Sequence, residues 1–224
     1  VRFVIHHDIP KSLESYYQET GRAGRDGGEG HCLAYYSYKD VEKLEKFLSG
    51  KPVAEQEIGF ALLQEVVAYA ETSMSRRKFL LHYFGEEFDS ETGEGADMDD
   101  NVRNPKAKVE AQDQVKKLIE VVRDTKHLYK SKEIIYTLIG RVNATIKAHK
   151  TDTQKFFGTG KDFEERYWMA LIRQVLVDGL LSKDIETYGI LKVTPKGLDF
   201  IKNPESFMMS EDHVYNQNED DAIV

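Results

Sequence analysis

Near the start of the chain, residues 18–27 read Gln18-Glu19-Thr20-Gly21-Arg22-Ala23-Gly24-Arg25-Asp26-Gly27. It places two arginines three positions apart, each directly after a glycine, so the backbone can approach a ligand while both guanidinium groups reach it. This arrangement suits a polyphosphate, whose oxygens are met from several directions at once. The alternative interpretation is a pair of surface arginines at a helix end, which the length of the full ten-residue motif disfavours.

Strand and helix signals alternate around this motif. We expect a buried strand over residues 2–7, a helix over 13–21 capped by Ser12, a second strand over 30–37 and a helix over 40–50. Elements in this order are typical of an α/β domain. Cys32 falls inside the second strand, so we expect a small core residue there. As the single cysteine, it excludes an internal disulfide and favours a reducing cytoplasm.

The pattern Q-x-x-G-R-x-G-R is motif VI of superfamily 2 helicases, and the preceding run Ile9-Pro10-Lys11-Ser12-Leu13-Glu14-Ser15-Tyr16-Tyr17 resembles the RecQ branch. The resemblance implies that residues 1–52 form the end of the second RecA-like lobe, with ATP and Mg²⁺ bound between the lobes of the intact enzyme. Arg25 would then be the arginine finger and Arg22 a second group at the phosphates or the lobe interface. Gln18 would couple the nucleotide state to DNA. Asp26 is expected to hold one of the two arginines in place.

No Walker A sequence, G-x-x-x-x-G-K-[ST], occurs in these 224 residues. We therefore expect the chain to be the C-terminal part of a motor, inactive as an ATPase by itself. A helical hairpin subdomain is expected over residues 53–107, with two helices joined near 72–73. Residues 86–101 hold eight acidic residues and no lysine or arginine, so a mobile loop is expected there.

RecQ relatives usually close this hairpin with a zinc ion bound by four cysteines. This chain has Ser75, Gly95, Met98 and Asn101 where the cysteines are expected, and none of these is a good zinc ligand. Acidic residues and a histidine of the same region would bind hard ions weakly at best: Asp97, Asp99, Asp100 and His82. We therefore expect no zinc, and a hairpin stabilised by apolar packing of Leu80, Tyr83 and Phe84.

Residues 108–204 show the order of elements found in a winged helix, and they resemble the RecQ C-terminal (RQC) domain. Helices are expected over 108–123, 132–138, 163–176 and 195–201, with strands over 180–185 and 190–194. Trp168 repeats with apolar residues at helical spacing and should be core. Residues 205–224 are expected to be an acidic disordered tail, a possible site for a protein partner. The fold class is therefore mixed α/β and α.

The net charge of −8 hides a local basic region. Residues 103–173 carry sixteen lysines and arginines against nine acidic residues, which favours DNA as a partner through its phosphates. Arg173 and Gln174 are expected on exposed helix faces, and Tyr188 is either a strand-separating aromatic at the wing tip or a packing residue. The other candidate contacts are Lys130, Ser131, Lys132, Arg141, Lys147, Lys150, Lys155, Lys161 and Arg166.

The resemblance as a whole implies a RecQ-type ATP-dependent 3′–5′ DNA helicase of DNA repair and recombination, acting on forked DNA or duplex with a single-strand tail. Two alternatives remain open: a non-enzymatic winged-helix DNA-binding adaptor, which has no use for the arginine pair, and a superfamily 2 RNA helicase, which would share motif VI. No apolar run is long enough to span a membrane, and the start lacks the pattern of a signal peptide. We expect a cytoplasmic, bacterial, nucleoid-associated protein.

Overall fold

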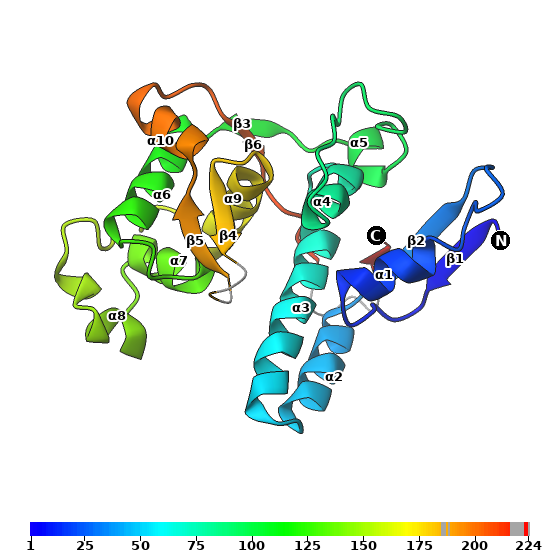
Figure 1. Cartoon of the computed structure of the whole chain (residues 1–224), viewed down its shortest axis with the longest axis horizontal. Helices are drawn as coiled ribbons and strands as arrows, with labels where there is room; N and C mark the ends of the chain where they lie inside the picture. Colours follow the sequence, from blue (N-terminus) through cyan, green and yellow to red (C-terminus); the bar gives the residue numbers. More distant parts are fainter. Residues whose placement is uncertain (185–186, 188, 216–221, 224) are drawn as a thin grey trace. The chain divides into compact units, whose positions relative to one another are not determined.

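The computed structural model describes residues 1–184, 187, 189–215 and 222–223, which form two compact units (Figure 1). Unit 1 comprises Val1–Arg103 and His213–Val224, and unit 2 comprises Asn104–Asp212. Both contain helices and strands, which confirms the expectation of a mixed fold.

Unit 1 begins with a strand–helix–strand element: β1 (Phe3–His6), α1 (Leu13–Thr20) and β2 (His31–Tyr36). The two strands are parallel, with Phe3 opposite His31 and His6 opposite Ala34. A parallel pair needs a long crossover connection, which α1 provides. The short strand β7 (Ala222–Ile223) pairs antiparallel with the other edge of β2.

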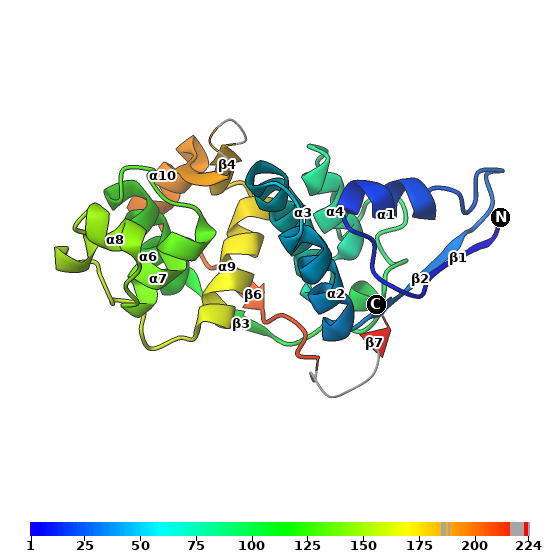
Figure 2. The ribbon, with the colours of Figure 1, turned by 90° about the horizontal axis from the view of Figure 1, so that it is seen from below.

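Four helices complete unit 1. The helices α2 (Tyr38–Ser49) and α3 (Val53–Glu71) lie side by side in both views (Figures 1 and 2). They are followed by α4 (Arg76–Tyr83) and the short α5 (Asp100–Arg103). The break between α3 and α4 lies at residues 72–75, where the sequence pattern placed the joint between two helices.

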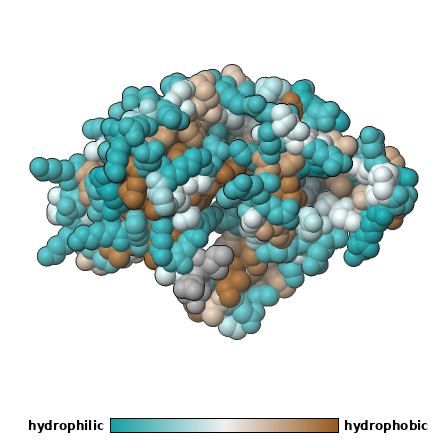
Figure 3. Space-filling view, turned by 45° about the horizontal axis from the view of Figure 1, so that its top comes forward, coloured by the Kyte–Doolittle hydropathy of each residue, from teal (hydrophilic) through white to brown (hydrophobic). Residues whose placement is uncertain are grey.

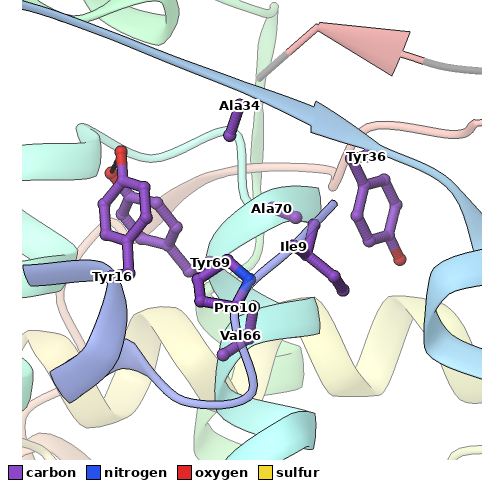
Figure 4. Close-up of a pocket in the computed structure, with 8 residues that line it drawn as sticks. All are labelled: Ile9, Pro10, Tyr16, Ala34, Tyr36, Val66, Tyr69 and Ala70. Carbon is purple, nitrogen blue, oxygen red and sulfur yellow. Dashed lines mark hydrogen bonds between the residues drawn. The ribbon is translucent and has the colours of Figure 1, made fainter. Parts of the chain in front are cut away.

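The core of unit 1 lies where α1, β2 and α3 meet. Tyr16 of α1 and Tyr69 of α3 pack with ring centroids 5.0 Å apart, and the Tyr69 hydroxyl donates to that of Tyr16 at 3.3 Å. These two rings and Tyr36 of β2 line different sides of a small cavity of about 20 Å³ (Figure 4). The remaining lining is mostly apolar, so the cavity is a packing feature of the core.

Unit 2 is built around Trp168, whose side chain is fully buried. Helix α9 (Glu165–Val177), which carries it, packs against α6 (Gln112–Asp124) and α7 (Ser131–Ile139). The antiparallel hairpin of β4 (Leu181–Asp184) and β5 (Ile190–Val193) matches the two predicted strands. The other elements are α8 (Ala144–Ala148), a 3-10 turn (Thr151–Thr153), α10 (Pro195–Lys202), β3 (Lys108–Glu110) and β6 (Met208–Ser210).

Three expectations about single elements are wrong. Strand β1 is not buried, because among the described residues it pairs only with β2, and Phe3 and Ile5 are each 63% exposed. Cys32 is exposed on β2 rather than part of the core. Residues 108–110 form β3 instead of the first turn of a helix, since Lys108 pairs with Ser210 across a two-stranded sheet.

The acidic segments are also more ordered than expected. In the loop predicted over residues 86–101, Asp99 and Asp100 bond to Ser75 and Arg76, and α5 begins at Asp100. In the tail predicted over residues 205–224, residues 208–210 form β6 and His213 donates its amide to the Glu71 carbonyl at 2.7 Å. In the loop, Ser75 and Arg76 bond to the acidic side chains, whereas residues 208–210 pair with β3 through the backbone. Residues 216–221 and 224 lie outside the described part of the chain.

Candidate functional sites

The arginine motif of residues 18–27 begins in the last turn of helix α1 and continues into the following loop. Ser12 caps the N-terminus of this helix by accepting a hydrogen bond from the Ser15 amide at 3.1 Å. At the other end, the buried His6 of β1 lies 2.7 Å from a Glu19 carboxylate oxygen, which ties the last turn of α1 to the sheet. The neighbouring Gln18 remains exposed.

The loop between α1 and β2 depends on its glycines. Gly24 has a φ of +72°, and a Cβ there would lie 2.5 Å from the Gly28 carbonyl oxygen. A Cβ at Gly30 would lie 2.7 Å from that of Ala23. These close approaches exclude any larger residue, so the glycines fold the loop back on itself and present the side chains between them.

Both motif arginines are exposed on this loop. Arg25 Nε donates to the Gly21 carbonyl at 2.9 Å, and this bond leaves the side chain exposed. Asp26 does not hold either arginine as expected; it pairs with Arg2 at 2.9 Å, because the loop turns back towards the start of β1. The pair Arg22 and Arg25 is therefore available to an external anion or to another domain.

In unit 2, two of the predicted DNA-binding residues, Lys132 and Arg141, lie close to the ring of Tyr136. Lys132 Nζ lies 5.7 Å and Arg141 Cζ 4.7 Å from the centroid of Tyr136. Arg141 also pairs with Glu165 at 3.3 Å, but its side chain remains 59% exposed. Helix α7 begins at Ser131, next to Lys132. Among the described residues, no side chain caps its N-terminus, so the Ser131 hydroxyl and the backbone amides of the first turn are suited to binding a phosphate.

The other predicted lysines flank this surface in sequence and are all exposed: Lys130, Lys147, Lys150, Lys155 and Lys161. The loop that carries the last two packs on α7, with the Gly158 amide donating to the Thr137 carbonyl at 2.8 Å. Figure 3 shows that the end of unit 2 that carries α8 is covered largely by hydrophilic side chains. Arg166 on α9 is half-buried.

Two of the expected contacts are not available. Arg173 is mostly buried and pairs with Asp212, and Gln174 is buried and exchanges hydrogen bonds with the backbone of Ser210. Strand β6, which the sequence pattern did not predict, packs against α9; Ser210 is its last residue, and Asp212 follows two positions later. Tyr188, the candidate at the wing tip, lies outside the described residues.

The residues at the expected cysteine positions do not fit a zinc ion. Ser75 donates to Asp99 at 2.9 Å, Asn101 binds two backbone carbonyls, and Gly95 lies beside Met98. Among the described residues, no three histidine, cysteine, aspartate or glutamate side chains form a group that could hold a metal. Of the three residues expected to stabilise the hairpin by apolar packing, Leu80 and Tyr83 pack against the core of unit 1, whereas Phe84 is 38% exposed.

A polar network that the sequence pattern did not predict lies in the same region. Its centre is Arg76, whose side chain is 6% exposed and pairs with Asp100. The signal was present in the sequence: two adjacent arginines, Arg76 and Arg77, stand at the start of a helix that precedes an acidic loop.

Comparison with known proteins identifies related families for both units. A family model described as the RQC domain matches residues 105–218, and one described as RecQ zinc-binding matches residues 38–99. Among the described residues, no helix is long and apolar enough to cross a membrane.

Three relatives each align with most of the chain. An ATP-dependent DNA helicase RecQ of Pasteurella multocida is 33% identical over 84% of this chain and 29% of its own length. The ATP-dependent DNA helicase Q-like 4B of Arabidopsis thaliana is 30% identical over 93% of this chain and 20% of its own length. A protein of Acanthamoeba polyphaga mimivirus, whose name describes an RNA helicase, is 31% identical over 90% of this chain and 39% of its own length. The chain therefore spans well under half the length of these relatives.

Proposed function

Because this chain belongs to the RecQ helicase family, we propose that it is the part of an ATP-dependent DNA helicase that joins the end of the second motor lobe to a hairpin and a winged helix. The division into residues 1–52, 53–107 and 108–204 is part of this proposal. The parallel β1–α1–β2 element supports the assignment of a RecA-like lobe, since it presents the arginine motif on the loop after a crossover helix.

The observation that carries the proposal is the exposure of Gln18 near the end of α1, and of Arg22 and Arg25 on the following loop, whose glycines fix its path. In the complete enzyme, ATP and Mg²⁺ would lie between this loop and another motor lobe. Arg25 would then stabilise the charge that develops on the γ-phosphate, and Arg22 would bind the phosphates or the lobe interface. Gln18 would couple this site to DNA.

The winged helix is the proposed DNA-binding element. Lys132 and Arg141 gather over Tyr136, and the exposed lysines that flank them provide further contacts to phosphates. Contacts of this kind bind the backbone without reading bases, so binding should be largely independent of sequence. Forked DNA is the proposed substrate, with 3′–5′ movement and a role in DNA repair and recombination following from the family resemblance.

An RNA helicase is the second candidate, because one relative carries that description. A winged helix favours DNA, since proteins that recognise RNA more often use single-strand modules such as OB or RRM folds. A non-enzymatic adaptor is disfavoured by the exposed arginine pair, which a purely DNA-binding protein does not require.

The test is binding of the chain to forked DNA, blunt duplex DNA, single-stranded DNA and forked RNA, followed by fluorescence anisotropy at two salt concentrations. We expect the tightest binding to forked DNA, a steep loss with salt, and a loss of about tenfold or more in the double variant Lys132→Glu/Arg141→Glu. The matched control is Lys46→Glu, a charge reversal at an exposed position of α2. Equal or tighter binding of forked RNA would favour the second candidate, and no binding at low salt would contradict the proposed DNA-binding role.

A further inference from the structure

The four expected cysteine positions lie in one region of unit 1, and each now has a different role. Ser75 accepts the Lys78 amide at the start of α4 and donates to Asp99, whose other oxygen accepts the Val102 amide in α5. One hydroxyl thus joins the first turns of two helices. Gly95 and Met98 lie beside Arg77, which donates to the Glu94 carbonyl and so holds the same loop.

Arg76 links the hairpin to its loop through a buried ion pair with Asp100. Its guanidinium group binds both oxygens of Asp100, with Nη2 and Oδ2 2.9 Å apart, while Nη1 donates to the Tyr69 carbonyl at 2.6 Å. A planar, bidentate pair of this kind is among the stronger hydrogen-bonded contacts in proteins. Burial alone would raise the pKa of Asp100, but the bonds from Arg76 lower that pKa below its ordinary value.

Asn101 joins three segments through one buried amide. Its Nδ2 donates to the carbonyls of Thr72 at 2.8 Å and Met74 at 2.7 Å, at the joint between α3 and α4. Its Oδ1 lies 2.8 Å from Nε2 of His213. A carbonyl oxygen must accept here, so the imidazole donates through Nε2. Both polar atoms of the amide are therefore used.

The segment His213–Tyr215 adds a further layer to this region. The His213 amide donates to the Glu71 carbonyl at 2.7 Å, and the Tyr215 hydroxyl donates to the Ala70 carbonyl at 3.3 Å. The Tyr215 ring also packs edge-on against Tyr36, with centroids 5.2 Å apart. These contacts satisfy carbonyls at the C-terminal end of α3, where no further helical turn can do so.

We propose that Arg76, Asp100, Asn101 and His213 form a metal-free clamp that closes the hairpin loop in place of zinc, and that the segment His213–Tyr215 is part of it. The proposal rests on the disagreement between the zinc-binding family model and the residues present in this chain. It is independent of helicase activity. A structural zinc holds such a loop through four ligands. In this chain the loop would be held instead by the Arg76–Asp100 ion pair, the buried Asn101 amide and His213.

The first test is the metal content and thermal stability of the chain produced in zinc-supplemented medium. We expect much less than one zinc per chain by mass spectrometry, and a melting temperature that a zinc chelator leaves unchanged. Asp100→Asn keeps the shape of the side chain but removes its charge, and should lower the melting temperature by about 4 °C or more. The matched control, Glu91→Gln, removes one charge from an exposed position of the same loop and should change it by about 1 °C or less.

The second test addresses the segment after the winged helix. His213→Ala removes the imidazole from Asn101 and should speed proteolytic cleavage within residues 86–99 several-fold, while Val214→Ala, at an exposed neighbouring position, should not. Stoichiometric zinc whose removal lowers the melting temperature would overturn the proposal. So would an Asp100→Asn variant that behaves like Glu91→Gln, or equal cleavage rates in the two variants of the segment.

Discussion

Arg25 is exposed in the middle of the loop between α1 and β2, and its one described hydrogen bond runs to the Gly21 carbonyl. Replacing it with alanine should therefore cost the fold about 1 kcal/mol or less. If Arg25 has the proposed role, Arg25→Ala in the complete helicase should reduce the kcat of DNA-stimulated ATP hydrolysis by about 10³-fold or more, because the charge of the transition state would lose its partner. The KM for ATP should change much less. Steady-state ATPase assays with and without DNA would measure both.

The control for this prediction is Arg123→Ala, an exposed arginine of α6 outside the motif. It should leave both kinetic parameters close to those of the unchanged protein. A kcat for Arg25→Ala within a few-fold of the control would remove Arg25 from the proposed role and leave Arg22 as the remaining candidate.

For single residues, the sequence identifies which side chains are functional candidates better than it predicts which residues they contact. The motif is recognised because its glycines and arginines occur at fixed spacing. The pairs His6–Glu19 and Arg2–Asp26 join residues far apart in sequence, and no local pattern points to them. The same applies to Arg173, whose partner Asp212 comes from a segment that the sequence pattern left unstructured.

Gly160 decides how tightly α9 packs on α7. A Cβ at this position would lie 2.6 Å from Cζ2 of Trp168 and 3.0 Å from Cβ of Leu138, and the Trp168 indole donates to the Gly160 carbonyl at 2.9 Å. Gly160→Ala should therefore overpack unit 2 and lower its free energy of unfolding by about 1–3 kcal/mol. Urea unfolding followed by tryptophan fluorescence measures this directly, because Trp168 is the single tryptophan of the chain.

Lys161→Ala is the matched control, since it changes the adjacent, exposed residue and should have an effect within about 0.5 kcal/mol. Equal unfolding midpoints for the two variants would mean that the loop moves away from Trp168 without cost, contrary to the packing described.

The longer elements were predictable because their apolar spacing is strong and their ends carry caps. Helix α10 begins with proline after Thr194, whose hydroxyl accepts the Gly197 amide, and its bounds match the prediction closely. Strands β3 and β6 were missed because each has three residues and pairs with a segment about a hundred positions away in sequence. Strands this short have too few residues to show an alternating pattern.

For the whole molecule, the sequence predicted the mixed composition of the fold but not which segments belong together. Residues 213–215 follow the winged helix in sequence yet belong to unit 1. Their contacts are made by one histidine and one tyrosine in an otherwise acidic segment, which composition alone assigns to a disordered tail. The place of residues 213–215 in unit 1 thus reflects long-range hydrogen bonds that no local pattern predicts.

The two units should respond differently to alkaline pH, because their buried phenols are unevenly distributed. Burial raises the pKa of five described tyrosines of unit 1: Tyr16, Tyr36, Tyr69, Tyr83 and Tyr215. In unit 2, burial raises the pKa of Tyr167 to about 12. Because the folded state binds the phenolic protons of these tyrosines more tightly than the unfolded chain does, protonation stabilises the fold. This stabilisation is complete below the pKa of a tyrosine in the unfolded chain, about 10. That stabilisation is lost as the pH rises further.

Unit 1 should therefore unfold at a lower alkaline pH than unit 2. The measurement is an alkaline titration in which far-ultraviolet circular dichroism follows the whole chain and the emission wavelength of Trp168 follows unit 2. Tyr83→Phe, which removes the hydroxyl that donates to Glu14 at 2.8 Å, should weaken the dependence on pH while costing about 1 kcal/mol at neutral pH. A single transition seen at the same pH by both probes, unmoved by Tyr83→Phe, would mean that buried phenols do not set the alkaline stability of unit 1.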